Sequence, residues 1–172
     1  LLLLRTFVNL VNLPTGFDAE GVVTARMAVQ GPQYDEIDRV IRFFESGVDR
    51  LKQLPGIDEA AVGASLPAER ALNMPATFPD SEQPDVTRVV NWRYVTPGYF
   101  SLLKIHHLAG RAINDADRAG ATPIAVVNET FARQNYGGVQ AALGRRIVVA
   151  KESPREIVGV VKHIKERPDE VD

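Results

Sequence analysis

Cysteine is absent from this sequence of 172 residues, and its absence removes three classes of chemistry at once. The chain cannot build a disulfide, a thiolate nucleophile or a cysteine-ligated metal site. The absence does not identify the compartment, because a cysteine-free chain works equally well in a reducing cytosol and in an oxidising periplasm.

Long apolar runs and a strong net charge are missing as well. No stretch reaches about 18 consecutive apolar residues, so the sequence is not expected to cross a membrane by itself. The net charge of -2 and the isoelectric point near 6.0 argue against a nucleic-acid-binding surface and against a polybasic membrane patch. The content of 45% hydrophobic residues is sufficient for the core of one domain or of two small lobes.

The first residues are four leucines followed by Arg5, without an initiating methionine. Apolar residues at helical spacing predict a helix over residues 2–12. Two interpretations of the leucines are open: a helix from a larger core, or the last turn of a membrane helix with Arg5 and Thr6 at the interface. These residues alone do not choose between them.

The clearest element is an amphipathic helix over residues 35–54, which Pro55 and Gly56 end. Alternating apolar residues predict a strand over 22–29, and a run of small residues predicts a second strand over 57–66. Together they predict a β-α-β unit.

Shorter elements are predicted after residue 66. Four prolines indicate a linker or irregular loop over residues 67–87, with one short strand near 74–78. The other predicted elements are a strand over 86–95 near a sheet edge, a helix over 99–103 capped by Gly98, a buried strand over 124–127, a helix over 129–135 capped by Asn128 and ended by Gly137, and a hairpin of strands 145–149 and 156–161.

Two adjacent histidines, His106 and His107, are the first candidates for chemistry. Neighbouring residues on a strand point to opposite faces, so this pair is not suited to share one metal ion. With His163 the chain has three histidines, but their spacing is not that of a zinc site. We therefore predict no metal, no cofactor and no catalytic residue among them.

Other motifs fail on spacing. The stretch NDADRAG at 114–120 lacks the later ligands of a calcium loop and indicates an Asx-type turn. The stretch GGVQAALGRR at 137–146 has neither the glycine spacing nor the lysine of a phosphate-binding loop. No serine lies in a nucleophile elbow.

The order of several short motifs is more specific than any one of them. VVNWRYVTPGYFSLLKIHHLAGR is followed by AVVNETFARQNY, then ALGRRI, then REIVGVVKHIK. In this order they resemble the MacB-type periplasmic core domain of bacterial ABC-transporter permeases, in the MacB/FtsX-like permease family. The resemblance covers residues 1–165.

The resemblance implies an α+β fold with two lobes. A porter-like β-α-β lobe would be built from both chain ends, residues 1–67 plus 153–172, with a stalk helix over residues 1–13. Residues 68–152 would form a smaller inserted α/β lobe. The chain ends would lie close together on the membrane-proximal side.

The resemblance also implies a function without catalysis. The domain would lie on the extracytoplasmic, periplasmic face of the bacterial inner membrane and couple ATP-driven motion to export or release of a substrate. Its partners would be a cytoplasmic ATP-binding subunit or domain, a second permease copy and a periplasmic adaptor or other extracytoplasmic protein, with no nucleic acid. The segment 67–87 and the turn 152–154 are hinge candidates, and the alternative interpretation, which we favour, is that both are plain loops. The motif residues expected to act as structural joints are Pro97, Gly98, Tyr99, Phe100, Asn128, Glu129, Gly144 and Arg145.

Two other classes stay open. A free-standing α/β enzyme or small-ligand-binding module would use His106, His107 and Arg111 in a pocket of converging polar groups. A static interaction scaffold would instead expose an apolar patch that includes Trp92 or Tyr94.

Overall fold

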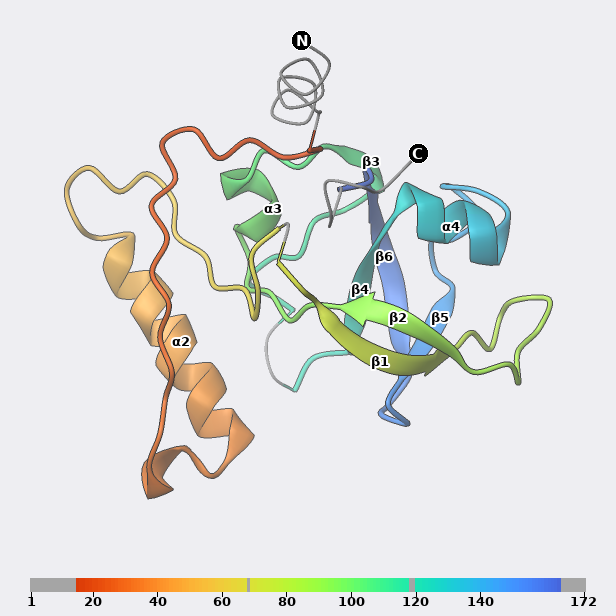
Figure 1. The fold of residues 1–172 in the computed structure, drawn as a ribbon, viewed down its shortest axis with the longest axis horizontal. Coiled ribbons are helices and arrows are strands. Elements are labelled where there is room, and N and C mark those ends of the chain that lie inside the picture. The colour runs from red at the N-terminus through yellow and green to blue at the C-terminus, as the bar shows by residue number, and fades with distance from the viewer. Residues whose placement is uncertain (1–14, 68, 118–119, 165–172) are drawn as a thin grey trace, which may run out of the picture.

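A six-stranded sheet forms the centre of the computed structural model, which describes residues 15–67, 69–117 and 120–164 (Figure 1). Its strands are β1 (Leu72–Thr77), β2 (Arg88–Trp92), β3 (His107–Gly110), β4 (Ile124–Asn128), β5 (Arg146–Val149) and β6 (Arg155–Val161). The pairs β1–β2, β1–β5, β5–β6 and β3–β6 are antiparallel, whereas β4 runs parallel to β6. The fold is therefore mixed α/β with a mainly antiparallel sheet.

The main core lies where β6 meets β4, β5 and helix α4 (Glu129–Tyr136). Its largest fully buried side chains are Phe78, Ile147, Ile157, Val149 and Val160. The ring of Phe78 packs edge-on against Phe131 of α4, with the ring centroids 5.3 Å apart. Burial of each such side chain contributes about 1.5–3 kcal/mol, so this cluster accounts for much of the stability of the sheet.

The ends of α4 confirm the prediction made from the sequence. The Asn128 side-chain oxygen accepts a hydrogen bond from the Phe131 N–H at 2.8 Å, as expected of an N-cap. Gly137 ends the helix in the left-handed conformation, with φ of 77°. The predicted hairpin is confirmed as β5 and β6, and the predicted strand at 124–127 is confirmed as β4.

Helix α2 (Ile37–Leu51) confirms the predicted amphipathic helix and follows a short 3-10 turn, η1 (Pro32–Tyr34). Figure 1 shows α2 to one side of the sheet. Val48 is its one buried residue, and Ile37 is 69% exposed. α2 thus has the predicted apolar stripe, but among the described residues only Val48 of this stripe is buried.

The predicted β-α-β unit does not form. Residues 22–29 are not a strand, and Val23 is 94% exposed. Residues 57–66 contribute only an isolated bridge between Gly63 and Val95. Alternation of apolar residues favours an extended backbone, but a strand also needs a paired neighbour, and no described strand lies beside either segment.

The segment 67–87 is more ordered than a linker, because it contains β1, the short strand predicted near 74–78. β2 lies at the end of the strand order, which confirms the predicted sheet edge. Helix α3 (Tyr99–Leu102) confirms the predicted short helix. β3 was not predicted. The predicted helix at 2–12 lies outside the described residues.

The first and last described segments lie against each other. A Cβ atom on Gly16 would overlap the carbonyl oxygen of His163, and Phe17 and Ile164 pack into the same apolar cluster. The chain ends themselves lie outside the described residues, so the expectation that they approach each other stays a prediction. β6 pairs with β3, β4 and β5, so residues 155–161 share one sheet with strands from the segment 68–152.

Candidate functional site

The motif TPGYF forms a compact corner around α3. Gly98 precedes α3 in the left-handed conformation, with φ of 89°, which favours glycine at this position. Tyr99, Leu103, Ile105 and Val161 are the buried residues of the cluster around it. We call α3 together with these four residues the α3 junction. Three segments that are distant in the sequence meet there.

The first of these segments is residues 15–18. The Asp18 backbone N–H donates to the Leu103 carbonyl at 2.9 Å, and Lys104 Nζ lies 2.7 Å from Asp18 Oδ2. The hydrogen bond from Lys104 holds the pKa of Asp18 below its ordinary value. Phe17 packs on the same cluster. Backbone, charge and apolar contacts therefore all attach this segment to the end of α3.

The second segment is the stretch around residues 59–65. The Thr96 N–H donates to the Val62 carbonyl at 2.9 Å, and the Val62 N–H donates to Thr96 Oγ1 at 2.8 Å. Gly63 lies so close to the Tyr99 ring that an added Cβ would be 2.7 Å from a ring carbon. The chain that follows α2 is thereby fixed to the TPGYF corner.

The third segment is the end of β6. Val161 is 4% exposed within the junction, and Ile164 packs on it from outside. The Lys162 N–H donates to the His106 carbonyl at 2.8 Å. The His163 N–H donates to Glu129 Oε1 at 3.4 Å, which connects this end of β6 to the first turn of α4.

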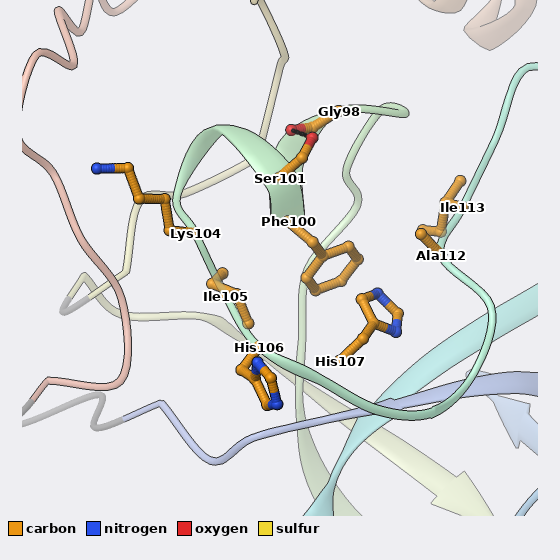
Figure 2. Close-up of a pocket in the computed structure, with 9 residues that line it drawn as sticks. All are labelled: Gly98, Phe100, Ser101, Lys104, Ile105, His106, His107, Ala112 and Ile113. Atoms are coloured by element: carbon orange, nitrogen blue, oxygen red, sulfur yellow. Dashed lines mark hydrogen bonds between the residues drawn. The ribbon is translucent and has the colours of Figure 1, made fainter.

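A pocket of about 360 Å³ opens on the junction (Figure 2). Its lining residues are Gly98, Phe100, Ser101, Lys104, Ile105, His106, His107, Ala112 and Ile113. Figure 2 shows the His107 ring beside Phe100 and the His106 ring turned away from it, as expected for neighbours in an extended chain. The ring centroids of Phe100 and His107 are 5.8 Å apart.

Burial lowers the pKa of His107, and the neighbouring charge of His106 lowers it further. Neither ring nitrogen of His107 has a hydrogen-bond partner among the described residues. The part of the chain that the structure describes contains no group of three metal-ligating side chains.

Arg111, the third residue of the enzyme hypothesis, is held by a carboxylate. Its guanidinium donates two hydrogen bonds to Asp117, at 2.7 and 2.8 Å. The Asn114 side-chain oxygen accepts from the Ala116 N–H at 2.9 Å, which confirms the Asx-type turn. The sequence indicated this turn but not the Arg111–Asp117 ion pair, because an Arg–Asp contact over six residues has no distinctive sequence pattern.

The remaining motif residues lie in two places. Asn128 and Glu129 begin α4 near the end of β6, close to the junction through the His163 contact. Gly144 and Arg145 lie beside the other end of β6, where the Gly144 N–H donates to the Ile157 carbonyl at 2.9 Å. The structure thus brings Pro97, Gly98, Tyr99 and Phe100 together, and it separates Gly144 and Arg145 from them along the strand.

An exposed aromatic patch, expected for a scaffold, is present only in part. Tyr94 is 44% exposed, and Trp92 packs edge-on against it with the ring centroids 6.1 Å apart. Arg155 lies over the Trp92 ring at 5.6 Å.

Comparisons with known proteins agree on one family. A family model described as the MacB-like periplasmic core domain matches residues 9–171. The periplasmic region of MacB from Actinobacillus actinomycetemcomitans has a similar fold, with a TM-score of 0.55 and 15% sequence identity over 69% of this chain. The extracellular domain of the noncanonic ABC-type transporter YknZ from Gram-positive bacteria gives a TM-score of 0.53 and 20% identity over 70% of this chain.

The chain covers 50% and 58% of those two structures, so it spans little more than half of their length. No curated protein matches the sequence significantly. Within the described residues, no helix is long and apolar enough to cross a membrane.

Proposed function

Because the chain belongs to the family of MacB-like periplasmic core domains, we propose that it transmits motion between the membrane part of an ABC-transporter permease and the extracytoplasmic space. The domain itself is non-catalytic in this role. ATP is hydrolysed by a cytoplasmic subunit or domain, and the movement reaches this chain through membrane helices. The result is export or release of a substrate on the outer side of the inner membrane.

The observation that carries this proposal is the meeting of both described ends at one place. Gly16 lies against the backbone of His163 and Ile164, and Phe17 and Ile164 both pack on the α3 junction. A displacement that enters through either end therefore acts on the same buried cluster. From there it passes to the sheet through Val161.

The junction also connects to the α2 side of the chain. Lys52, directly after α2, pairs with Glu59 at 2.7 Å, and Glu59 lies against Gly98. We propose that residues 1–67 and 153–172 act as a porter-like lobe and residues 68–152 as the inserted lobe. β6 then links the two lobes, since it extends from the junction into the sheet.

Relative motion of two lobes needs short hinges between rigid parts. β1 is part of the sheet, so within 67–87 the hinge role is confined to the residues that flank β1 and Phe78. The second candidate, the 152–154 turn, joins β5 to β6 within one sheet, so it does not separate the two lobes. A second permease copy and a periplasmic adaptor or other extracytoplasmic protein would contact these moving lobes.

The test is a reversible lock on the junction of the full-length permease. Asp18→Cys and Lys104→Cys place one thiol on each side of the contact in which Lys104 Nζ lies 2.7 Å from Asp18 Oδ2, in a segment without cysteine, and any cysteine elsewhere in the permease is replaced by serine. We expect that a short thiol-to-thiol crosslink slows ATP turnover of the reconstituted permease. Asp18 lies in the proposed porter-like lobe and Lys104 in the inserted lobe, so the crosslink prevents the two lobes from moving relative to each other.

The matched control is a second long-range ion pair away from the junction. Asp80→Cys and Arg146→Cys replace a pair whose charged atoms lie 2.6 Å apart, at the start of β5. A crosslink there should leave turnover unchanged. Equal turnover with and without the junction crosslink would refute the coupling role.

A further inference from the structure

His107 is a half-buried histidine at the α3 junction whose two ring nitrogens are buried without a polar partner. Neither its Nδ1 nor its Nε2 has a hydrogen-bond partner among the described residues. Its ring packs edge-on against Phe100, with an interplanar angle of 79°. On the other side, a Cβ added to Gly159 of β6 would lie 3.3 Å from His107 Cε1. Apolar contacts alone therefore hold a neutral imidazole between α3 and β6.

Buried polar atoms are nearly always hydrogen-bonded, so this ring is an exception that needs a reason. The cost is modest while the ring is neutral. It increases when the ring is protonated, because two buried N–H groups then lack an acceptor.

The charged groups on every side of the ring offer no compensation. Lys104 after α3 and His106 on the neighbouring position are basic. On the loop after β3, Arg111 is paired with Asp117. None of the described residues that line the pocket is acidic. On β6, Gly159 lies near the ring and Val161 pairs with His107, while Lys162 after β6 adds a further cation and donates its N–H to the His106 carbonyl.

We propose that His107 is an acid-sensitive latch: when its imidazole takes up a proton, the contact between α3 and the β3–β6 pair opens. An acidic extracytoplasmic medium then loosens the connection between the chain ends and the sheet. This consequence for transport rests on the proposed function, whereas the acid response itself is a property of the chain.

The sign follows from the environment of the ring. Its pKa in the closed junction is lowered from the ordinary value of 6.5. Above about pH 6.5 the imidazole is neutral in both the open and the closed junction, and the closed junction has its full stability. As the pH falls below 6.5, the open form binds a proton that the closed form rejects, so opening increases. The opening constant rises by up to about tenfold for each pH unit until the pKa of the closed form is reached.

Hydrogen exchange of the amides between residues 99 and 110 measures this opening directly. After correction for intrinsic exchange rates, we expect a larger opening constant at about pH 5.5 than at about pH 7.5, by at most about tenfold. His107→Phe keeps an aromatic ring but cannot titrate, so the increase should disappear. The matched control is His106→Gln, which removes the exposed neighbour and the smaller of the two causes, so most of the increase should remain.

Opening that is independent of pH in the wild-type chain would overturn the proposal, and so would an increase that persists in His107→Phe. If His107→Phe does not fold, NMR titration of the three histidine Cε1 protons in the wild-type chain decides instead. A His107 midpoint clearly below 6.5 supports the latch, and a midpoint at or above 6.5 refutes it. These measurements use the chain in solution, so they can fail while the crosslinked permease still behaves as proposed, and the reverse also holds.

Discussion

Gly159, in the middle of β6, is a position where one added methyl group should be costly. A Cβ there would overlap the carbonyl oxygen of Arg111 and lie 3.3 Å from His107 Cε1. The Arg111 backbone cannot easily withdraw, because its N–H donates to the Val158 carbonyl at 2.9 Å and its side chain is held by Asp117. Gly159→Ala must therefore displace β6 or the loop after β3.

The magnitude follows from what has to move. Overpacking a well-packed site typically costs about 1–3 kcal/mol, and a strained backbone hydrogen bond adds about 1 kcal/mol. We expect Gly159→Ala to lower the free energy of unfolding by about 3 kcal/mol. For a chain of this length, that corresponds to a Tm lower by about 6–12 °C.

Gly47→Ala is the matched control with the opposite sign. Gly47 lies inside α2, and a Cβ there would meet no atom within 4 Å. Alanine in a helix interior is more favourable than glycine by about 0.5–1 kcal/mol, so the Tm should rise slightly. Thermal unfolding followed by circular dichroism compares both variants with the wild type. A Gly159→Ala variant as stable as the wild type would refute the close approach of β6 and the Arg111 backbone.

Three further changes test the rest of the account. Phe78→Ala empties a fully buried site beside Phe131, and we expect a loss of about 3–5 kcal/mol in urea unfolding; a loss below about 1 kcal/mol would contradict this core. Asn128→Ala removes the cap on α4 and should cost about 1 kcal/mol, whereas Asn128→Asp should retain most of it; equal losses in both variants would exclude a capping role. The Arg146 hydrogen bond lowers the pKa of Asp80 from 3.8, so this pair stabilises the fold above about pH 3.8 and the contribution is lost as the pH falls through the lowered pKa. Stability curves of wild type and Arg146→Gln should therefore converge in acid, and curves that stay parallel down to about pH 2 would contradict the pairing.

Local signals in the sequence predicted much of the sheet. Asn128 and Gly137 marked both ends of α4, and the hairpin of β5 and β6 followed from two apolar runs around a proline turn. Gly98 before an aromatic pair predicted α3. Each of these signals depends on neighbouring residues only, so no tertiary information was needed.

The errors lie where structure depends on distant partners. Residues 22–29 have the pattern of a strand, but their exposed backbone has no paired neighbour in the described chain. β3 is four residues long and exists because β6 pairs with it, which no local pattern reveals. Likewise, the motif TPGYF predicted a joint, while its contacts with Phe17, Val62 and Val161 became visible only in the folded chain.

The central claim is that this domain lies on the extracytoplasmic side of a membrane permease, and a single cysteine tests it most directly. Ser153→Cys puts one thiol on the exposed connection between β5 and β6, in a segment without a cysteine of its own, and any cysteine elsewhere in the full-length protein is replaced by serine. The full-length protein is then treated in intact spheroplasts with a maleimide that cannot cross the inner membrane. We expect the same extent of maleimide labelling before lysis as after lysis. Labelling that appears only after lysis would place the domain in the cytoplasm and contradict the account.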